Sequence, residues 1–300
     1  MSSTMKILPV AFALGMSPAV YAELESITDG ELSGVTGQSG ITIDYSGRMS
    51  MQEFRYEDSG EYVAEEIRSG GAGVTGAGAA AGYGENFDDA RLTFDIAADG
   101  GLDILWQSQS GQPMDWGFAA GTVSVGNGES GPRSRIFADV QGWGFLRTSQ
   151  YSVLPSAEAG LGGRSAIYNY AAFTVEDLSS SKTPGTIGID GGYIQSPDYT
   201  GNPLEDMNLT DQIPAWAAGQ RARSATPMDD IRAGFAAAEY TVYRGATGSE
   251  QGGPNDNLVI GVSGFAADIG AQNMSVGQRD LGTMTLDNLQ ISDTIITLTP

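Results

Sequence analysis

The sequence predicts an all-β fold, in which antiparallel strands form a large sandwich or roll with a short helical cap at the N-terminus. Three observations carry this prediction. Short segments of alternating apolar and polar residues recur along the chain, glycine is abundant (43 of 300 residues), and charged residues make up only 17%. Such a composition is typical of many short strands joined by tight turns. A β-solenoid-like stack of strands is the alternative architecture.

Residues 1–22 have the pattern of a secretory signal peptide. Lys6 supplies a positive charge, Ile7 to Met16 is an apolar stretch, and Val20-Tyr21-Ala22 places small residues where signal peptidase reads them. The apolar stretch is shorter than the roughly 20 residues that a membrane-spanning helix needs. We therefore expect export across the inner membrane of a Gram-negative-type bacterium to the extracellular space or outer cell surface, with the periplasm as the alternative.

Residues 23–68 are expected to hold the helical cap and the first strands. Thr28 and Glu31 have the spacing of a capping box, and Gly37 fits the left-handed position that ends a helix. A helix of about two turns is unstable alone in water, so it must pack against an apolar surface. The alternation over Ile41 to Tyr45 then predicts a strand.

Residues 69–84, SGGAGVTGAGAAAGYG, are a low-complexity Gly/Ala stretch that predicts a flexible surface loop. The main β-domain is expected over residues 85–300. Apolar residues alternate over 91–96 and again over 102–106, which is typical of a hairpin with one buried face. The proline-rich stretch 197–227 interrupts the strand pattern and predicts a long loop.

That long loop carries the candidate metal ligands of the sequence. Hard cations such as calcium bind clustered carboxylate and amide oxygens. The spacing of the cluster matches no EF-hand or nonapeptide repeat, so a solvated loop without metal is the alternative, and no other cofactor is expected. The candidate calcium ligands are Asp198, Asn202, Glu205, Asp206 and Asp211.

The overall composition excludes several functions. A net charge of −22 argues against nucleic acid and anionic membrane surfaces as partners. The chain has no cysteine and no histidine, which excludes a Ser-His-Asp triad, a cysteine nucleophile and a histidine-ligated zinc.

An enzyme that uses two carboxylates stays open, because sugar sites place aromatic side chains beside acids. Core packing of the tryptophans is the competing interpretation, since they lie on alternating strand segments. The residues concerned are Trp106, Trp116 and Trp143 with the nearby Asp103, Asp115 and Asp139.

The run Asp29 to Ile43, DGELSGVTGQSGITI, directly follows the signal peptide. It resembles the start of the FilA-like pilus-system proteins, a family of secreted bacterial proteins, and Asp280 to Leu289 is similar to the closing strands of that family. The resemblance implies export and a role in surface filaments, and it supplies no catalytic residues. Gln38 and Gly40 have no evident structural role in this run, so they are candidates for docking a partner.

We therefore expect an exported, non-enzymatic cell-surface or filament-associated structural protein that does not span a membrane. Its partners would be other surface or filament proteins, or further copies of itself. The alternatives are an extracellular carbohydrate- or ligand-binding β-sandwich and a carboxylate-pair glycan hydrolase.

Overall fold

The chain divides into two units, residues 1–37 and 38–300. The predicted helical cap belongs to the first unit and lies outside the described residues. The computed structural model describes residues 40–57, 60–96, 100–128, 131–154, 165–196, 235–245 and 257–298, all of which belong to the second unit.

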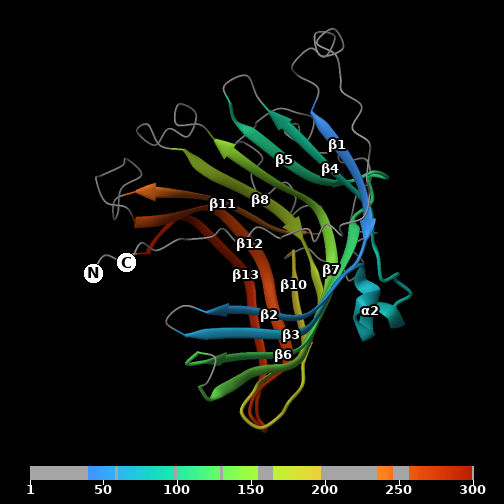
Figure 1. The fold of residues 1–300 in the computed structure, drawn as a ribbon, viewed down its shortest axis with the longest axis vertical. Helices are drawn as coiled ribbons and strands as arrows, with labels where there is room; N and C mark the ends of the chain where they lie inside the picture. The colour runs from blue at the N-terminus through green and yellow to red at the C-terminus, as the bar shows by residue number, and fades with distance from the viewer. Residues whose placement is uncertain are drawn as a thin grey trace. The chain divides into compact units, whose positions relative to one another are not determined.

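The described residues form one 13-stranded sheet in which every pairing is antiparallel (Figure 1). The prediction of an antiparallel all-β fold is confirmed, and the alternative of a solenoid-like stack is wrong. The strands are β1 (Ile41–Gly47), β2 (Met49–Glu57), β3 (Glu61–Gly70), β4 (Phe87–Ile96), β5 (Leu102–Ser108), β6 (Met114–Gly126), β7 (Arg133–Leu154), β8 (Ala166–Phe173), β9 (Val175–Ser180), β10 (Ile187–Gln195), β11 (Ala236–Gly245), β12 (Asn257–Val276) and β13 (Arg279–Leu298). The 3-10 helix η1 (Ala72–Val74) and the helix α2 (Gly76–Ala80) lie between β3 and β4.

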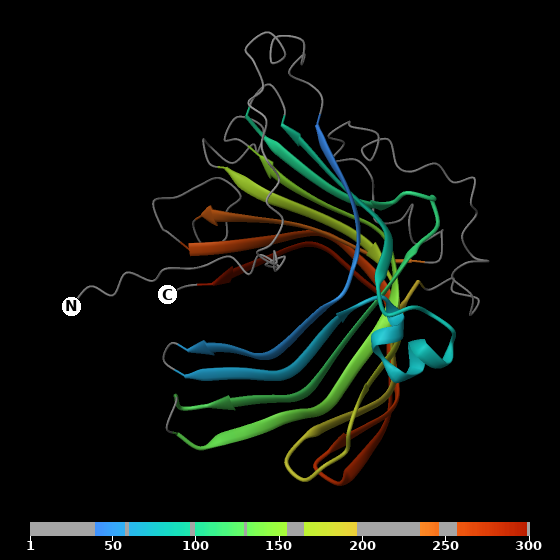
Figure 2. The ribbon, with the colours of Figure 1, turned by 45° about the vertical axis from the view of Figure 1, so that its right-hand side comes forward.

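The sheet follows a simple up-and-down path that is bent near its middle. Strand β7 pairs with β6 over Arg133–Leu146 and with β5 over Thr148–Val153, so β5 and β6 continue each other along one edge of β7. In the same way, β1 continues into β2, β3 into β4, β8 into β9 and β10 into β11, each pair forming one long strand with an interruption. These five interrupted strands and the continuous β7, β12 and β13 make eight long antiparallel strands within the described ranges. Figures 1 and 2 show the bend in β7.

Six strands close a hydrogen-bonded ring around this bend, in the order β7, β8, β11, β12, β10 and β9. Strands β8 and β9 are separated only by Thr174. Strands β10 and β11 meet β12 at adjacent positions, because Gln195 opposes Asp268 and Ala237 opposes Ala266. The loop predicted at 197–227 therefore belongs to the connection between β10 and β11, and it lies outside the described residues.

Irregular backbone accompanies the bend. Glu66, Asp89, Asp139 and Asn288 have positive φ angles of 54°, 60°, 48° and 49°. Non-glycine residues adopt such angles rarely. Asp89 and Asn288 coincide with register shifts of β4 against β1 and of β13 against β12, as bulges produce. The register of β7 against β8 also shifts between Leu146 and Thr148.

The Gly/Ala stretch 69–84 differs from its prediction as a flexible surface loop. It ends β3 and then forms η1 and α2, with Ala72 fully buried. Thr75 caps α2, since its hydroxyl accepts the N–H of Gly78 at 3.0 Å. A Cβ at Gly78 would lie 2.1 Å from the carbonyl oxygen of Ala72. The small residues therefore allow η1 and α2 to pack closely against each other.

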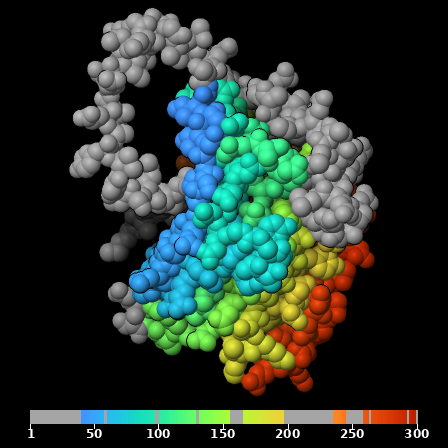
Figure 3. All heavy atoms as spheres, turned by 90° about the vertical axis from the view of Figure 1, so that its right-hand side faces the viewer, coloured from blue at the N-terminus to red at the C-terminus, as the bar shows by residue number. Residues whose placement is uncertain are grey.

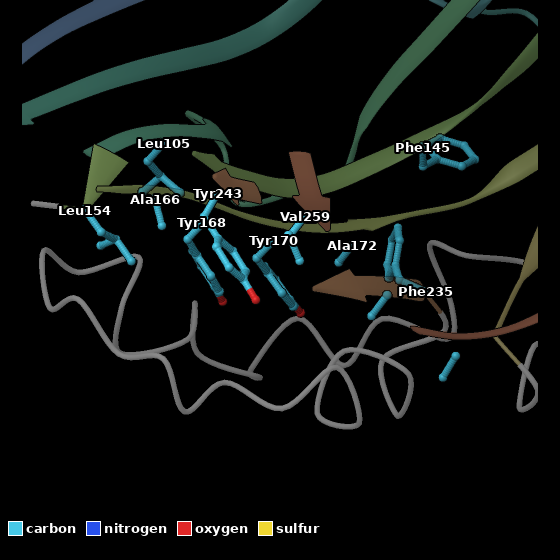
Figure 4. Packing of buried hydrophobic residues seen from close by; sticks show 12 residues of the cluster. Leu105, Phe145, Leu154, Ala166, Tyr168, Tyr170, Ala172, Phe235, Tyr243 and Val259 are labelled. Atoms are coloured by element: carbon cyan, nitrogen blue, oxygen red, sulfur yellow. The ribbon is translucent and has the colours of Figure 1, made fainter. Parts of the chain in front are cut away.

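The larger core cluster lies on the face of the sheet that η1 and α2 cover. Tyr83, just after α2, packs against Trp143 and Phe145, with ring centroids 5.3 and 5.6 Å apart. Leu105 belongs to the same cluster. Figure 4 shows Tyr168, Tyr170 and Tyr243 of this cluster projecting to one side of the sheet. No helix of the described ranges is long and apolar enough to cross a membrane.

Candidate functional site

Two neighbouring depressions form a polar groove on the face that carries α2. Their volumes are about 370 and 660 Å³, and Asp139 and Gln141 of β7 line both of them. Figure 3 views this face, with η1 and α2 in cyan beside the green and yellow strands. The other polar residues that line the groove are Ser50, Gln52, Glu66 and Arg68 in the larger depression and Ser179, Ser180, Ser181, Lys182, Asp190, Asn273 and Ser275 in the smaller one.

Strand register explains why these distant residues meet. Ser50 opposes Arg68, Arg68 opposes Ala119, Ala119 opposes Gln141, and Gln141 opposes Ser179. Directly opposed residues in antiparallel strands point to the same face. The five positions therefore form one row across β2, β3, β6, β7 and β9.

Hydrogen bonds fix the side chains of the groove. Gln141 Oε1 accepts the N–H of Gly76 at 3.0 Å, which ties the start of α2 to β7. The Ser181 hydroxyl donates to Asp139 Oδ2 at 2.8 Å. Lys182 Nζ donates to Asp280 at 2.6 Å, and this hydrogen bond is the main cause that lowers the pKa of Asp280. The cation at this end of the groove is therefore paired with a carboxylate.

Two of the acidic groove residues stand on left-handed backbone. Glu66 and Asp139 have φ angles of 54° and 48°, a conformation that costs free energy for a residue with a side chain. Gly121 of β6 lies beside Glu66, and a Cβ there would approach Glu66 Oε2 to 2.7 Å. Glycine at 121 thus leaves room for the Glu66 carboxylate on the sheet surface.

A second polar cluster lies under η1 at the bend. Asp115 Oδ2 accepts the N–H of Ala72 at 2.7 Å, and burial raises the pKa of Asp115. Burial also raises the pKa of Tyr83, and the negative charges of Asp115 and Glu176 add to this effect. Glu176 accepts a hydrogen bond from Thr174 Oγ1 at 2.6 Å. Asp115 thus has a structural role, because it accepts the hydrogen bond from the first residue of η1.

The tryptophans and acids singled out in the sequence do not gather in one cleft. Trp106 follows Leu105 in β5 and so points away from the cluster that holds Trp143. Trp106 packs instead near Tyr45 and Phe87, with ring centroids 6.4 and 6.0 Å apart. Within the described ranges, no three Asp or Glu side chains are close enough to hold a metal ion.

The remaining predicted site residues have a mixed outcome. Gly40 has a structural role after all, because a Cβ there would lie 2.3 Å from the carbonyl oxygen of Phe94. Gln38 lies outside the described residues, and its docking role stays a prediction. The candidate calcium ligands Asp198, Asn202, Glu205, Asp206 and Asp211 also lie outside the described residues.

The opposite face of the sheet carries a row of aliphatic side chains that sequence reasoning missed. Pairwise register connects seven strands, from β4 to β13, through residues that directly oppose one another. Every member is at least partly exposed. This aliphatic row consists of Ile96, Leu102, Val153, Ile167, Val242, Ile260 and Ile296.

A buried ion network joins three strands near the other end of the sheet. The Glu61 side chain of β3 has no exposed surface. It accepts hydrogen bonds from Arg55 Nη1 at 2.7 Å and from Arg133 Nε and Nη2 at 2.9 and 2.7 Å. Gly126 lies between Glu61 and Arg133 in the register, so no side chain blocks the contact.

This network predicts a loss of stability in acid. The hydrogen bonds from Arg133 are the main cause that lowers the pKa of Glu61 below its ordinary value of 4.5. A carboxylate with a lowered pKa contributes stability above its unfolded pKa, and that contribution disappears as the pH falls through the folded pKa. Urea unfolding of the wild type and of Glu61→Gln at neutral pH and below pH 4.5 measures this effect. We expect Glu61→Gln to be the less stable protein at neutral pH and the difference to shrink in acid; a difference independent of pH would contradict the prediction.

Comparison with known proteins yields one partial similarity. Residues 1–98 match the model of a family of unknown function, DUF6160. The match ends just past β4, so it covers the N-terminal segment and the first two long strands of the sheet. No curated protein and no solved structure gave a match.

Proposed function

We propose that this protein is an exported, non-enzymatic structural component of the cell surface that assembles with further copies of itself through its sheet edges. The observation that carries the proposal is that, among the described residues, neither sheet edge pairs with a further strand. Among the described strands, β13 pairs only with β12, β1 only with β4, and β2 only with β3. Such edges present free backbone N–H and C=O groups to another chain.

The two edges suit each other. The edge of β1 and β2 is the first of eight alternating strands and the edge of β13 is the last, so they run antiparallel. Neither edge contains lysine or proline, two of the residues that commonly protect edges against association. Joining the first edge of one copy to the last edge of the next is a head-to-tail contact, which builds filaments when the rotation does not close a ring.

The aliphatic row supports the same proposal. It begins at Ile96 of β4, the strand that pairs with the edge strand β1, and ends at Ile296 of the edge strand β13. Edge-to-edge addition would extend this row from one copy to the next. Contiguous exposed apolar surface of this kind marks interaction surfaces in soluble proteins, and the resemblance of the N-terminal run to filament-associated proteins points in the same direction.

Engineered thiols test the assembly, because the chain contains no cysteine of its own. Thr42 of β1 and Thr297 of β13 lie in the same half of the sheet, near the two edges. We expect the double variant Thr42→Cys/Thr297→Cys to form a ladder of dimers and larger species when treated with a short bismaleimide. The pair Thr42→Cys/Thr285→Cys is the matched control, since Thr285 lies on the same edge strand in the other half of the sheet.

The products are read by denaturing electrophoresis and by electron microscopy of the uncross-linked protein. A ladder confined to the first pair supports head-to-tail assembly. Cross-linked monomer alone would show that the two edges close within one chain, and uncross-linked monomer would show that they do not meet. Either of these two results would overturn the proposal.

A further inference from the structure

We propose that the polar groove is a binding site for an extended, uncharged glycan chain. The two depressions that make up the groove share Asp139 and Gln141 and together include residues from β2 to β12, and most of their lining side chains donate or accept hydrogen bonds. At about 4.8 Å between neighbouring strands, its six strand spacings give a length of roughly 29 Å. It lies on the face opposite the aliphatic row, so this inference is independent of the proposed assembly.

Small residues make the floor of the groove. Ala119 and Gly121 of β6 line the larger depression, and Gly188 of β10 lines the smaller one. A Cβ at Gly188 would approach the Ser275 hydroxyl to 2.3 Å. Side chains that rise on either side of this floor can therefore reach a chain lying across the strands.

The chemistry of the lining suits sugar hydroxyls. Glu66, Asp139 and Asp190 offer carboxylate acceptors, while Arg68 and Asn273 offer donors. A sugar hydroxyl can donate one hydrogen bond and accept others, so a chain of sugars can satisfy both kinds of group along the row. Binding sites built on hydrogen bonds in this way reject ligands that lack the hydroxyls.

Other polymers fit the groove less well. A peptide that adds to a sheet needs a free strand edge, but β6, β7 and β9 are each paired on both sides. Nucleic acids and acidic polysaccharides would meet three carboxylates in the groove and a net charge of −22 on the chain. An uncharged, extended chain is thus the ligand class that the geometry favours.

Calorimetric titration of the exported, signal-free chain with cellohexaose tests the inference. Cellohexaose is an extended β-1,4-linked glycan, and maltohexaose, which curls, is the comparison ligand. We expect cellohexaose to bind more tightly than maltohexaose. We also expect Asp139→Asn and Asp190→Asn each to weaken binding about tenfold or more, the usual effect of losing a hydrogen bond to a charged acceptor.

Asp89→Asn is the matched control for these variants. Asp89 also has a positive φ angle, of 60°, but it lies in β4 outside the groove. Asparagine tolerates the positive φ angles of Asp89 and Asp139 well, and Asp190 has no positive φ angle, so all three variants should fold, as circular dichroism can verify. Loss of affinity in the two groove variants with unchanged affinity in Asp89→Asn supports the inference.

Three results would overturn it: no heat of binding with either hexasaccharide, equal affinity in all variants, or binding of an oligolysine peptide in place of the glycans. Cross-linking of the edges on the same preparation separates this inference from the proposed assembly. A chain that assembles without binding sugars contradicts only the glycan site. A chain that binds sugars as a monomer contradicts only the assembly.

Discussion

Replacing Gly144 with alanine is expected to lower the free energy of unfolding by about 3 kcal/mol, the upper range for steric overpacking. A Cβ at this position would lie 2.0 Å from the carbonyl oxygen of Thr174 and 3.0 Å from the Cα of Val175. Both obstacles are backbone atoms. They are also held in place, because the N–H of Thr174 donates to the carbonyl oxygen of Phe145 at 2.8 Å and the N–H of Phe145 donates to Thr174 Oγ1 at 3.2 Å.

The matched control is Gly84→Ala. Nothing lies within 4 Å of the Cβ that alanine would add at Gly84, so its effect should stay within about 0.5 kcal/mol. Guanidinium unfolding followed by circular dichroism measures both variants against the wild type. Equal stability of Gly144→Ala and the wild type would mean that β7 and the junction of β8 and β9 are not in backbone contact.

Local periodicity was sufficient to predict the strands that follow a simple alternation. The apolar residues of 91–96 and 102–106 predict a hairpin, and β4 and β5 form that hairpin with Ile96 opposite Leu102. The strand predicted at Ile41–Tyr45 is the first strand of the sheet. The pairing is predicted correctly because alternation within one strand decides which side chains face the same way. The predicted burial of that face is wrong at its end, since Ile96 is 68% exposed, whereas Leu105 on the other face of β5 is 8% exposed.

The long strands and their bend could not be predicted in this way. Gly142 suggests a break between two short strands, yet β7 continues from Arg133 to Leu154 without interruption. The reason is a distant residue: a Cβ at Gly142 would lie 3.2 Å from the side chain of Leu178 in β9. Glycine here serves close packing between strands, and the sequence around position 142 does not reveal its partner.

The groove escaped prediction for a related reason. Asp139 was singled out as an acid near Trp143, but Gln141 and Ser179 carried no local signal. They line one groove only because β7 and β9 pair with Gln141 opposite Ser179. Alternation predicts which residues share a face of one strand, whereas register between strands separated in sequence determines which faces join. The register of β7 against β6 also shifts between Val123 and Ser124, and composition does not mark this shift.

Phe145 is the second position where we expect a large effect. The variant Phe145→Ala should lower the free energy of unfolding by about 4 kcal/mol, as is usual when a buried phenylalanine is truncated. Phe145 is only 3% exposed. Its ring packs edge-on against Tyr83 and Trp143, with centroids 5.6 and 5.9 Å apart, and such aromatic pairs add to the free energy of burial.

Phe54→Ala is the matched control, because Phe54 is 43% exposed and contacts Tyr62 at a centroid distance of 6.3 Å. Its cost should be below about 1 kcal/mol, since little apolar surface is buried there. Guanidinium unfolding separates the two variants. Similar costs at both positions would contradict the cluster beneath α2 as a main source of stability.

The variant Phe145→Ala should also loosen the segment between β3 and β4, which contains η1 and α2 and borders the groove. Tyr83 follows α2 directly, and the N–H of Gly76 at the start of α2 donates to Gln141. Without the Phe145 ring, Tyr83 loses one of its two aromatic neighbours. We therefore expect limited proteolysis to cleave within residues 71–84 faster in Phe145→Ala than in Phe54→Ala, under conditions where both variants remain folded. Faster cleavage at β-strand positions only would show that Phe145 stabilises the sheet and not the attachment of α2.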